Sequence, residues 1–284
     1  MRKKYLIIGG DSKLGKHLCS YLKEKKFFFF KTSRKNKKNF LLLDLKKPNK
    51  FVIPKDINYC FFLAGITSYE KCEKNKSSKI INVKNTFYLI KNLIMKGIHV
   101  NFISSNTVFG GMTLKTNEHD KKNPKFAYAK HKSQCEDKII KWTKKNKLQK
   151  FLSITRLTKM IDSKSMPLPF WQKKIKKKEK IFPFYDYYFS PITFSYVCRS
   201  LIKISKHNFF GIFHLSNNRN LSYCSFSKIY LKKNKNLIEC ISMNTKKNII
   251  FRYKPIYADI KMKYTKKNLN IVPQNMKSLL RNLL

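Results

Sequence analysis

The sequence IIGGDSKLGKHL, from Ile7 to Leu18, decides the fold. An apolar run precedes Gly9, and an amphipathic helical pattern follows Ser12. Gly9 and Gly15 therefore bracket a tight turn between a strand and a helix, where free backbone N–H groups and the helix dipole favour a pyrophosphate. Glycine is needed there because a Cβ would block the approach of the backbone to the phosphates. An ordinary strand–turn–helix, with glycines for geometry alone, remains an open alternative for this segment.

The first 157 residues alternate short apolar runs with longer helical patterns, which is typical of βαβ units and a parallel sheet. Strands are predicted at 4–9, 27–31, 40–44, 58–65, 99–104 and 151–157, and helices at 13–24, 74–97 and 126–147. Beyond Leu157 the pattern is less regular, with a helix near 193–206, a strand at 211–216 and a helix from Ser222. We predict an α/β fold: a doubly wound, Rossmann-type parallel sheet over residues 1–157 that binds a dinucleotide, and a small, mostly substrate-binding region over 158–284.

Length and composition indicate a globular chain. The 284 residues are 42% hydrophobic, which is enough to fill a core. The longest apolar runs fall far short of the ~20 residues that cross a bilayer, so no membrane span and a cytoplasmic location are expected. The seven cysteines include no C-x-x-C pair, so neither a disulfide framework nor a metal site is predicted.

The formal net charge of +48 raises the alternative of a nucleic-acid partner. Only 7 of the 63 basic residues are arginine, the side chain expected where forked contacts to bases and phosphates are needed. The lysines are spread along the whole chain and form no single stripe. We therefore interpret the charge as a solvated lysine surface with nonspecific affinity for polyanions, and predict no specific nucleic-acid partner.

The residues that end the second predicted strand bear on the choice of cofactor. An acid at this place accepts a hydrogen bond from the ribose 2′-hydroxyl of NAD, but the sequence reads KTSRK at 31–35. Thr32, Ser33 and Arg34 suit a 2′-phosphate instead, through hydrogen bonds and a charge-assisted pair. NADPH is therefore favoured over NADH, and the alternative is a solvated basic loop.

A serine pair and a tyrosine supply the next signal. Ser104 and Ser105 end the fifth strand, where open α/β sheets deliver side chains to the ligand crevice. Tyr128 begins the following helix, with Lys132 one turn later. The Tyr-x-x-x-Lys spacing occurs three times, also at residues 21/25 and 257/261, but only Tyr128 has such a serine upstream.

These motifs, taken in order, resemble the extended short-chain dehydrogenase/reductases, within them the dTDP-4-dehydrorhamnose reductase-like branch. The segments that carry the resemblance are GGDSKLG, LLLDL, FFLAGITSYEKCE, Asn82, ISSNTVFGG, Glu118, Pro124, YAKHKSQCE, TRLTK, DYYFSPI and GIFHLS. Several ordered motifs at family-like spacings are far more specific than any one of them.

The resemblance implies catalytic roles for four residues. Tyr128 would be the general acid that protonates a keto oxygen, and Lys132 would bind the nicotinamide ribose and lower the pKa of Tyr128 from the ~10 of a free phenol. Ser105 would hold the substrate carbonyl by a hydrogen bond. Asn82 would support the backbone of the active site and a water that relays protons.

The resemblance also implies two sets of binding residues. The cofactor-binding set is Gly9, Gly10, Ser12, Lys13, Leu14, Gly15, Thr32, Ser33, Arg34, Asp44, Leu45, Ala64, Gly65, Tyr128 and Lys132. The substrate-binding set is Ser105, Asn106, Thr107, Arg156 and Asp186. Two positions depart from the family pattern: Ser12 replaces the middle glycine of the turn, and Asn106 replaces an acid.

The implied activity is that of an NADPH-dependent reductase acting on a keto group of a nucleotide-activated deoxysugar, for surface polysaccharide synthesis. The expected partners are this nucleotide-sugar substrate and, as an open alternative, a second copy of the chain in a homodimer. Two alternatives have the same fold: a non-catalytic NADP-binding subunit, and a nucleotide-sugar epimerase or dehydratase with no net consumption of NADPH.

Overall fold

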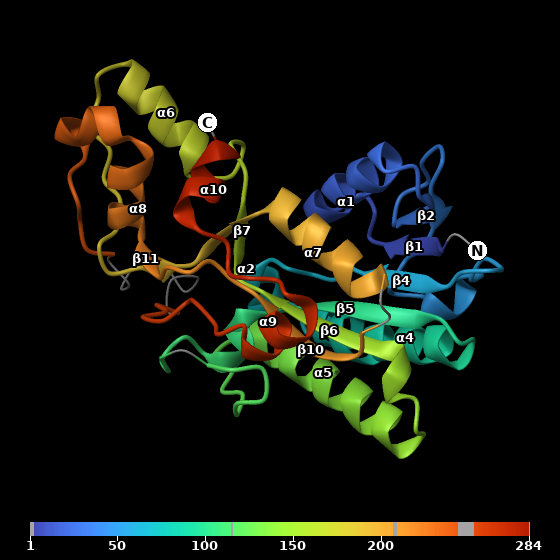
Figure 1. Cartoon of the computed structure of the whole chain (residues 1–284). Helices are drawn as coiled ribbons and strands as arrows, with labels where there is room; N and C mark the ends of the chain where they lie inside the picture. Colours follow the sequence, from blue (N-terminus) through green and yellow to red (C-terminus); the bar gives the residue numbers. More distant parts are fainter. Residues whose placement is uncertain (1–2, 115, 207–208, 244–252, 284) are drawn as a thin grey trace.

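The computed structural model describes residues 3–114, 116–206, 209–243 and 253–283. Its centre is a parallel sheet of seven strands, in the spatial order β10-β6-β5-β4-β1-β2-β3 (Figure 1). The strands are β1 (Lys4–Ile8), β2 (Phe28–Ser33), β3 (Leu41–Leu42), β4 (Tyr59–Phe62), β5 (His99–Ser105), β6 (Leu152–Leu157) and β10 (Gly211–Leu215). This is the strand order of a doubly wound Rossmann sheet, extended by β10.

Helices cover both faces of the sheet, because side chains that alternate along each strand are apolar on both sides. On one face, Ile7 and Phe61 pack against α1 (Lys13–Glu24) and α7 (Phe194–Lys206). On the other face, Ile8 and Phe62 pack against α4 (Thr86–Met95) and α5 (Ala127–Lys145). The predicted Rossmann-type α/β class is confirmed.

Helix α1 shows how the opening sequence builds this arrangement. Its N-cap is Ser12, whose hydroxyl accepts a hydrogen bond from the N–H of Gly15 at 3.0 Å. Leu14, Leu18 and Leu22 recur at helical spacing and are buried against the sheet. A Cβ on Gly15 would lie 2.2 Å from the carbonyl oxygen of Gly9, so only glycine lets the helix begin this close to the turn.

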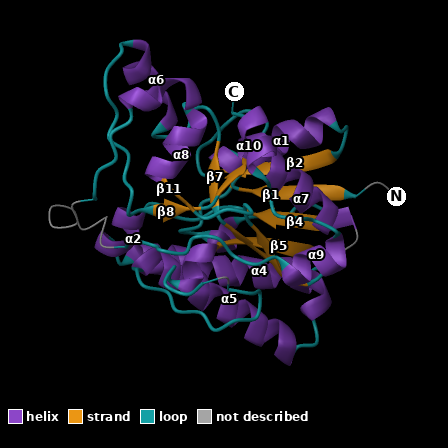
Figure 2. Ribbon diagram, turned by 60° about the vertical axis from the view of Figure 1, so that its left-hand side comes forward, coloured by secondary structure: helices purple, strands orange, loops and turns teal. Residues whose placement is uncertain are grey.

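A second group of elements forms a lobe at one end of the sheet (Figure 2). Its members are β7 (Lys159–Ile161), α6 (Leu168–Lys176), β8 (Tyr188–Phe189), β9 (Pro191–Thr193), β11 (Leu221–Ser222), α8 (Tyr223–Tyr230) and α10 (Met276–Arg281). They surround a core of their own that includes Trp171, Phe189 and Phe226. Strand β7 connects this lobe to the sheet, because it follows β6 almost directly along the chain, and it pairs in parallel with the short strand β9.

The predicted division at residue 157 does not hold for the sheet. Strand β10 lies far beyond that boundary, yet it pairs with β6 from Gly211 opposite Ser153 to Leu215 opposite Leu157. Helix α7, also beyond the boundary, packs on α1. The chain therefore returns to the sheet after it has built much of the second lobe.

The predicted helix over 74–97 is confirmed from Ser77 to Met95, but it begins later than predicted and changes its helical type along its length. The segment contains the end of α2 (Tyr69–Lys74), α3 (Ser77–Lys79), a π-helix at Ile80–Asn85, and α4. The break occurs at Asn75, whose backbone is extended and whose carboxamide accepts a hydrogen bond from the N–H of Ser77 at 2.9 Å. The segment 193–206 and the segment after Ser222 are helical as predicted.

The remaining elements are short. They are α9 (Lys263–Leu269) and the 3₁₀ segments Pro48–Lys50, Asn106–Phe109, Gln149–Phe151 and Lys232–Leu237. None of the helices in the described ranges combines the length and the apolar character that a membrane crossing requires.

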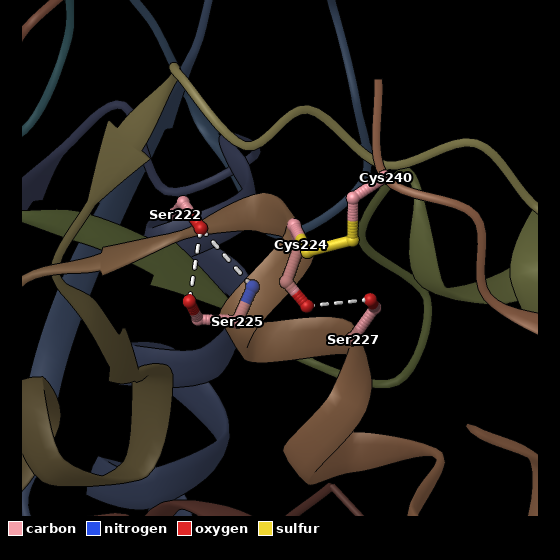
Figure 3. The surroundings of a disulfide bond; sticks show 5 residues. All are labelled: Ser222, Cys224, Ser225, Ser227 and Cys240. Atoms are coloured by element: carbon pink, nitrogen blue, oxygen red, sulfur yellow. Dashed lines mark hydrogen bonds between the residues drawn. A yellow bond between two sulfur atoms is a disulfide. The ribbon is translucent and has the colours of Figure 1, made fainter. Parts of the chain in front are cut away.

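One disulfide bond, between Cys224 and Cys240, corrects the prediction that the cysteines form none (Figure 3). Cys224 lies on α8, and Cys240 lies on a segment that runs beside residues 181–185 through bridges of Ile181 to Ile238 and of Phe184 to Ile241. The two Cα atoms are 5.6 Å apart. The two cysteines are 16 residues apart and form no C-x-x-C motif, so this pair could not be predicted from the sequence.

Thiol counting tests the disulfide directly. We expect the protein purified without reductant and unfolded in denaturant to react through five thiols, since Cys19, Cys60, Cys72, Cys135 and Cys198 are free. After reduction the count should rise to seven. Seven reactive thiols before reduction would show that Cys224 and Cys240 are not bonded.

Candidate functional site

A cavity of about 660 Å³ opens where the main sheet meets the second lobe. The glycine turn after β1, the end of β5, the start of α5 and the β6–β7 connection contribute to one side. Residues Tyr187–Ser190 and Tyr223 contribute from the second lobe. This is the carboxyl edge of a parallel sheet, where doubly wound folds bind their ligands.

The structure brings Ser105, Tyr128 and Lys132 together in this cavity. Ser105 is the last residue of β5, and Tyr128 is the second residue of α5, so strand and helix deliver them to the same place. The ammonium of Lys132 donates to the carbonyl of Ile103 at 2.7 Å and lies 4.5 Å from the centre of the Phe102 ring. The other two Tyr-x-x-x-Lys pairs do not line the cavity.

Burial controls the protonation of both groups on α5. Burial raises the pKa of Tyr128, and the nearby Cys72 raises it further, whereas a hydrogen bond with Ser105 opposes the shift. Lys132 is not among the groups that shift this pKa, so the expectation that it lowers the pKa of Tyr128 stays a prediction. Burial also lowers the pKa of Lys132, to about 8. Tyr128 is a neutral phenol at neutral pH, which is the form that can donate a proton.

Asn82 holds the loop that follows β4. Its carboxamide oxygen accepts from the N–H of Ile66 at 2.8 Å, and its Nδ2 donates to the carbonyl of Ile66 at 2.9 Å. Asn82 is buried within the π-helix, a form that is frequent at functional sites. The neighbouring Thr67 and Ser68 line the cavity, so Asn82 fixes part of the cavity wall through the backbone.

The side chains after β5 form a small polar cluster. The hydroxyl of Ser105 accepts from the N–H of Thr107 at 3.2 Å and from its hydroxyl at 3.1 Å. Asn106 donates from Nδ2 to the carbonyl of Ala258 at 2.7 Å. Ser105, Asn106 and Thr107 all line the cavity. Asn106, which replaces the acid of the family pattern, therefore connects the end of β5 to the C-terminal segment of the chain.

The glycine turn fits a pyrophosphate. Ser12, Lys13 and Leu14 line the cavity. In the described part of the chain, the backbone N–H groups of Lys13 and Leu14 have no acceptor, because the N-cap hydroxyl of Ser12 serves Gly15. Two free donors at the positive end of a helix are what a phosphate requires. The ammonium of Lys13 itself pairs with Asp162 at 2.7 Å.

The end of β2 differs from the arrangement expected from the sequence. Thr32 and Ser33 are buried, and their hydroxyls already serve the turn: Thr32 accepts from the N–H of Gly9 at 3.0 Å, and Ser33 donates to Asp11 at 2.9 Å. Asp11 also pairs with Lys37 at 3.6 Å. Arg34 is exposed. Sequence reasoning missed Asp11, because this carboxylate comes from the glycine turn and not from β2.

The other cofactor positions lie around the same edge. Gly10 donates its N–H to the carbonyl of Thr32 at 3.0 Å, and a Cβ on Gly9 would meet the backbone of Ala64. Gly65 has a φ of +154°, and Asn82 lies beside it. Asp44, after β3, accepts from the N–H of Lys46 at 2.9 Å, and Leu45 is buried. Ligand contacts at these positions remain predictions.

An aromatic wall is formed by four tyrosines that are not among the predicted site residues. Tyr69, Tyr187, Tyr223 and Tyr253 line the cavity. The ring of Tyr69 lies 5.4 Å from that of Tyr128, and Tyr223 stacks on Tyr187 at 5.5 Å and on Phe189 at 4.3 Å. Tyr69 follows the N-cap Ser68 in the connection from β4 to α2, and this position near the carboxyl edge of the sheet was the signal for it.

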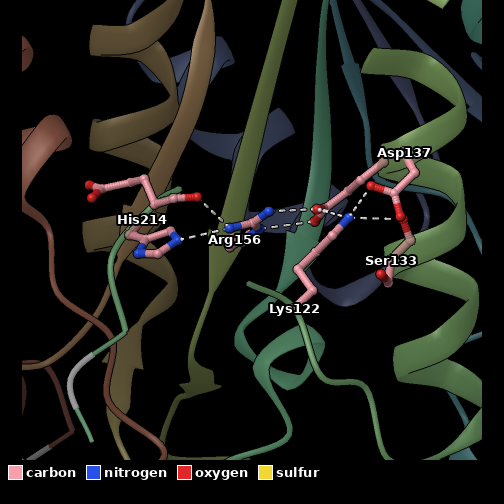
Figure 4. A network of polar contacts seen from close by, with 7 residues as sticks. Lys122, Ser133, Asp137, Arg156 and His214 are labelled. Atoms are coloured by element: carbon pink, nitrogen blue, oxygen red, sulfur yellow. Dashed lines mark hydrogen bonds and ion pairs between the residues drawn. The ribbon is translucent and has the colours of Figure 1, made fainter. Parts of the chain in front are cut away.

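Arg156 and Asp186 do not lie where the resemblance placed them, because neither lines the cavity. Arg156 is 2% exposed and is bonded on all sides by protein groups (Figure 4). Asp186 pairs with Lys254 and accepts from the hydroxyl of Ser242 at 2.8 Å and from the N–H of Met243 at 2.9 Å. Both side chains hold segments of the chain together, which corrects their assignment as substrate-binding residues.

The Arg156 network fastens α5 to β6. The Nη2 and Nε atoms of Arg156 donate to the two carboxylate oxygens of Glu136 at 2.7 and 3.1 Å. Nη1 donates to the carbonyl of Glu118 at 2.8 Å, and Lys122 pairs with Glu136 at 3.2 Å. Burial alone would raise the pKa of Glu136, but Arg156 and Lys122 outweigh it and hold that pKa below its usual range.

Replacement of Arg156 should destabilise the fold. In Arg156→Ala, Glu136 is left as a fully buried carboxylate without its forked partner, and such a loss costs about 3–5 kcal/mol of unfolding free energy. The measurement is denaturant unfolding, with Arg199→Ala as the control because Arg199 is an exposed arginine on α7. Equal stability of Arg156→Ala and Arg199→Ala would contradict a structural role for Arg156.

The wild type should also lose stability as the pH falls below about 4.3, where Glu136 takes up protons more readily in the unfolded chain.

The fold and the site define a class. The structure combines a Rossmann-type sheet with a serine, a tyrosine and a lysine gathered beside a turn that fits a pyrophosphate. This combination defines an NAD(P)-dependent oxidoreductase of the short-chain dehydrogenase/reductase type. The chain belongs to the RmlD substrate binding domain family, which matches residues 3–284. The resemblance found in the sequence is thus confirmed.

Solved structures agree with the family. A dTDP-4-dehydrorhamnose reductase from Yersinia enterocolitica has a TM-score of 0.80 at 19% identity, covering 99% of this chain and 98% of that one. A hypothetical dTDP-4-dehydrorhamnose reductase from Sulfolobus tokodaii has a TM-score of 0.79 at 20% identity, with 99% of both chains covered. The Bacillus anthracis enzyme in complex with NADP has a TM-score of 0.78 at 18% identity, covering 99% and 98%. No curated protein matches the chain in sequence.

Proposed function

We propose that the protein is an NADPH-dependent reductase of a keto group on a nucleotide-activated deoxysugar, acting in surface polysaccharide synthesis. The observation that carries this proposal is the placement of Ser105, Tyr128 and Lys132 in one cavity beside the free N–H groups of α1. A subunit that only binds the dinucleotide would not need all three side chains there.

The residues of the chain have separate tasks in this reaction. Ser105 would hold the substrate carbonyl, and the neutral phenol of Tyr128 would donate its proton to the carbonyl oxygen. Lys132 would stabilise the phenolate that remains, since its ammonium lies one turn away on the same helix face. NADPH, when bound, supplies the hydride.

The family and the aromatic wall support the proposed substrate class. The stacked rings of Tyr187, Tyr223 and Phe189 offer a flat apolar surface of the kind on which a nucleobase stacks. The hydroxyl and amide groups after β5 supply hydrogen bonds for a sugar. The solved relatives named above as dTDP-4-dehydrorhamnose reductases support a dTDP-linked 4-keto sugar as the first substrate to test.

Replacement of Tyr128 tests the reaction. With a panel of 4-keto-6-deoxy nucleotide sugars, the wild type should oxidise NADPH steadily, and Tyr128→Phe should be about 10²–10⁴-fold slower because the general acid is lost. Absorbance of NADPH is the readout, and NADPH binding by both proteins is the control for folding. Binding of NADPH without turnover by the wild type would favour the non-catalytic subunit, and sugar conversion without net NADPH loss would favour an epimerase or dehydratase.

Arg34 should decide part of the preference for NADPH. Thr32 and Ser33 already bond groups of the turn, whereas Arg34 is exposed and has no ion-pair partner in the described part of the chain, so its charge is available for a 2′-phosphate. We expect Arg34→Ala to weaken NADPH binding about tenfold, as befits one lost charge-assisted contact, and to leave NADH binding unchanged. Fluorescence titration of both cofactors measures this, with Arg199→Ala as the control. Equal losses for both cofactors would exclude a 2′-phosphate contact.

A further inference from the structure

Lys159 occupies a distinctive place at the cavity. It is the first residue of β7 and follows the end of β6 by two positions. Its backbone is held firmly: the N–H of Thr158 donates to the carbonyl of Leu215 at 3.1 Å, and Lys159 pairs with Pro191 of β9. The side chain lines the cavity that also contains Tyr128. A fixed backbone at this edge positions a charge for a ligand.

The ammonium of Lys159 has no hydrogen-bond or ion-pair partner within the described ranges. The other two lysines at the cavity are already engaged, Lys13 by Asp162 at 2.7 Å and Lys132 by the carbonyl of Ile103 at 2.7 Å. Among the described residues that line the cavity, Glu70 is the one carboxylate, and it pairs with Lys74 at 2.7 Å. The described part of the chain therefore places a positive charge here and no counter-charge beside it.

The surroundings of Lys159 make an anion favourable. The side chain is reached by water through the open cavity, yet protein atoms surround it closely enough that burial lowers its pKa, and the nearby Lys13 lowers it further. The free N–H groups of Lys13 and Leu14 line the same cavity and add positive potential. A bound anion would compensate for both the lost hydration and the repulsion between the two lysines.

We propose that Lys159 binds a phosphate group of a ligand in this cavity. This inference rests on the proposed function, because that function brings two sources of the same chemistry: the diphosphate of the nucleotide-sugar and the pyrophosphate of the dinucleotide. Lys159 is then a residue that selects phosphate-bearing ligands and takes no part in proton transfer.

Binding to the intact chain tests the role of Lys159 without any turnover. NADPH is titrated by its fluorescence, and dTDP, UDP and GDP are titrated by calorimetry, with wild type, Lys159→Gln and Lys159→Arg. The control is Lys164→Gln, which removes the same charge from an exposed position nearby that does not line the cavity. Thermal unfolding of each variant checks that it is folded.

We expect Lys159→Gln to weaken one of the two ligand classes about 10- to 100-fold, the effect of one lost charge-assisted contact, and to lessen the salt dependence of that affinity. Lys159→Arg should retain most of the affinity, and Lys164→Gln all of it. A loss confined to a nucleoside diphosphate assigns Lys159 to the substrate, and a loss confined to NADPH assigns it to the dinucleotide.

Unchanged affinities of Lys159→Gln for every ligand that the wild type binds would overturn this inference and leave the proposed reductase intact. A wild type that binds neither NADPH nor any of the diphosphates would overturn the inference and the proposed function together. An equal loss in Lys164→Gln would show a general effect of surface charge and would also overturn the assignment.

Discussion

The buried ion pair between Arg156 and Glu136 is the interaction on which the site depends. It joins β6 to α5 where both are fully enclosed, and α5 carries Tyr128 and Lys132. A forked guanidinium–carboxylate contact fixes distance and orientation together, so a helix held in this way cannot slide along the sheet. Its contribution is therefore positional as much as energetic, since buried pairs often add little net stability.

Desolvation sets the chemistry of the same region. The environment that encloses Tyr128 keeps its phenol protonated and at the same time makes the ammonium of Lys132 easier to deprotonate. The carbonyl of Ile103 and the ring face of Phe102 stabilise the charged form of Lys132, which offsets the cost of its burial. A proton donor that is neutral before the reaction, beside a cation ready for the phenolate afterwards, is suited to reduction of a carbonyl.

Local periodicity predicted the strands and most helices well, because βαβ units are built from contacts between sequence neighbours. It failed where distant segments meet. The tyrosines of the aromatic wall come from separate parts of the chain. Cys224 and Cys240 are 16 residues apart, and β10 returns to the sheet after much of the second lobe has been built. Asp11 was missed and Arg156 was assigned to the substrate for a related reason. A charged residue in a motif can bond other groups of the protein, and only the structure shows its partners.

In a chain with so many lysines, the contacts of each ammonium show which of them has a specific task. With a net charge of +48, a cation on the surface says little, since water and salt screen it and the composition supplies it everywhere. A cation inside a cavity is different, because each one there loses hydration and repels its neighbours. Lys13 and Lys132 compensate for that cost with protein acceptors. A third lysine in the cavity, Lys159, has no such acceptor among the residues that the structure describes, which is consistent with a ligand that supplies the missing charge.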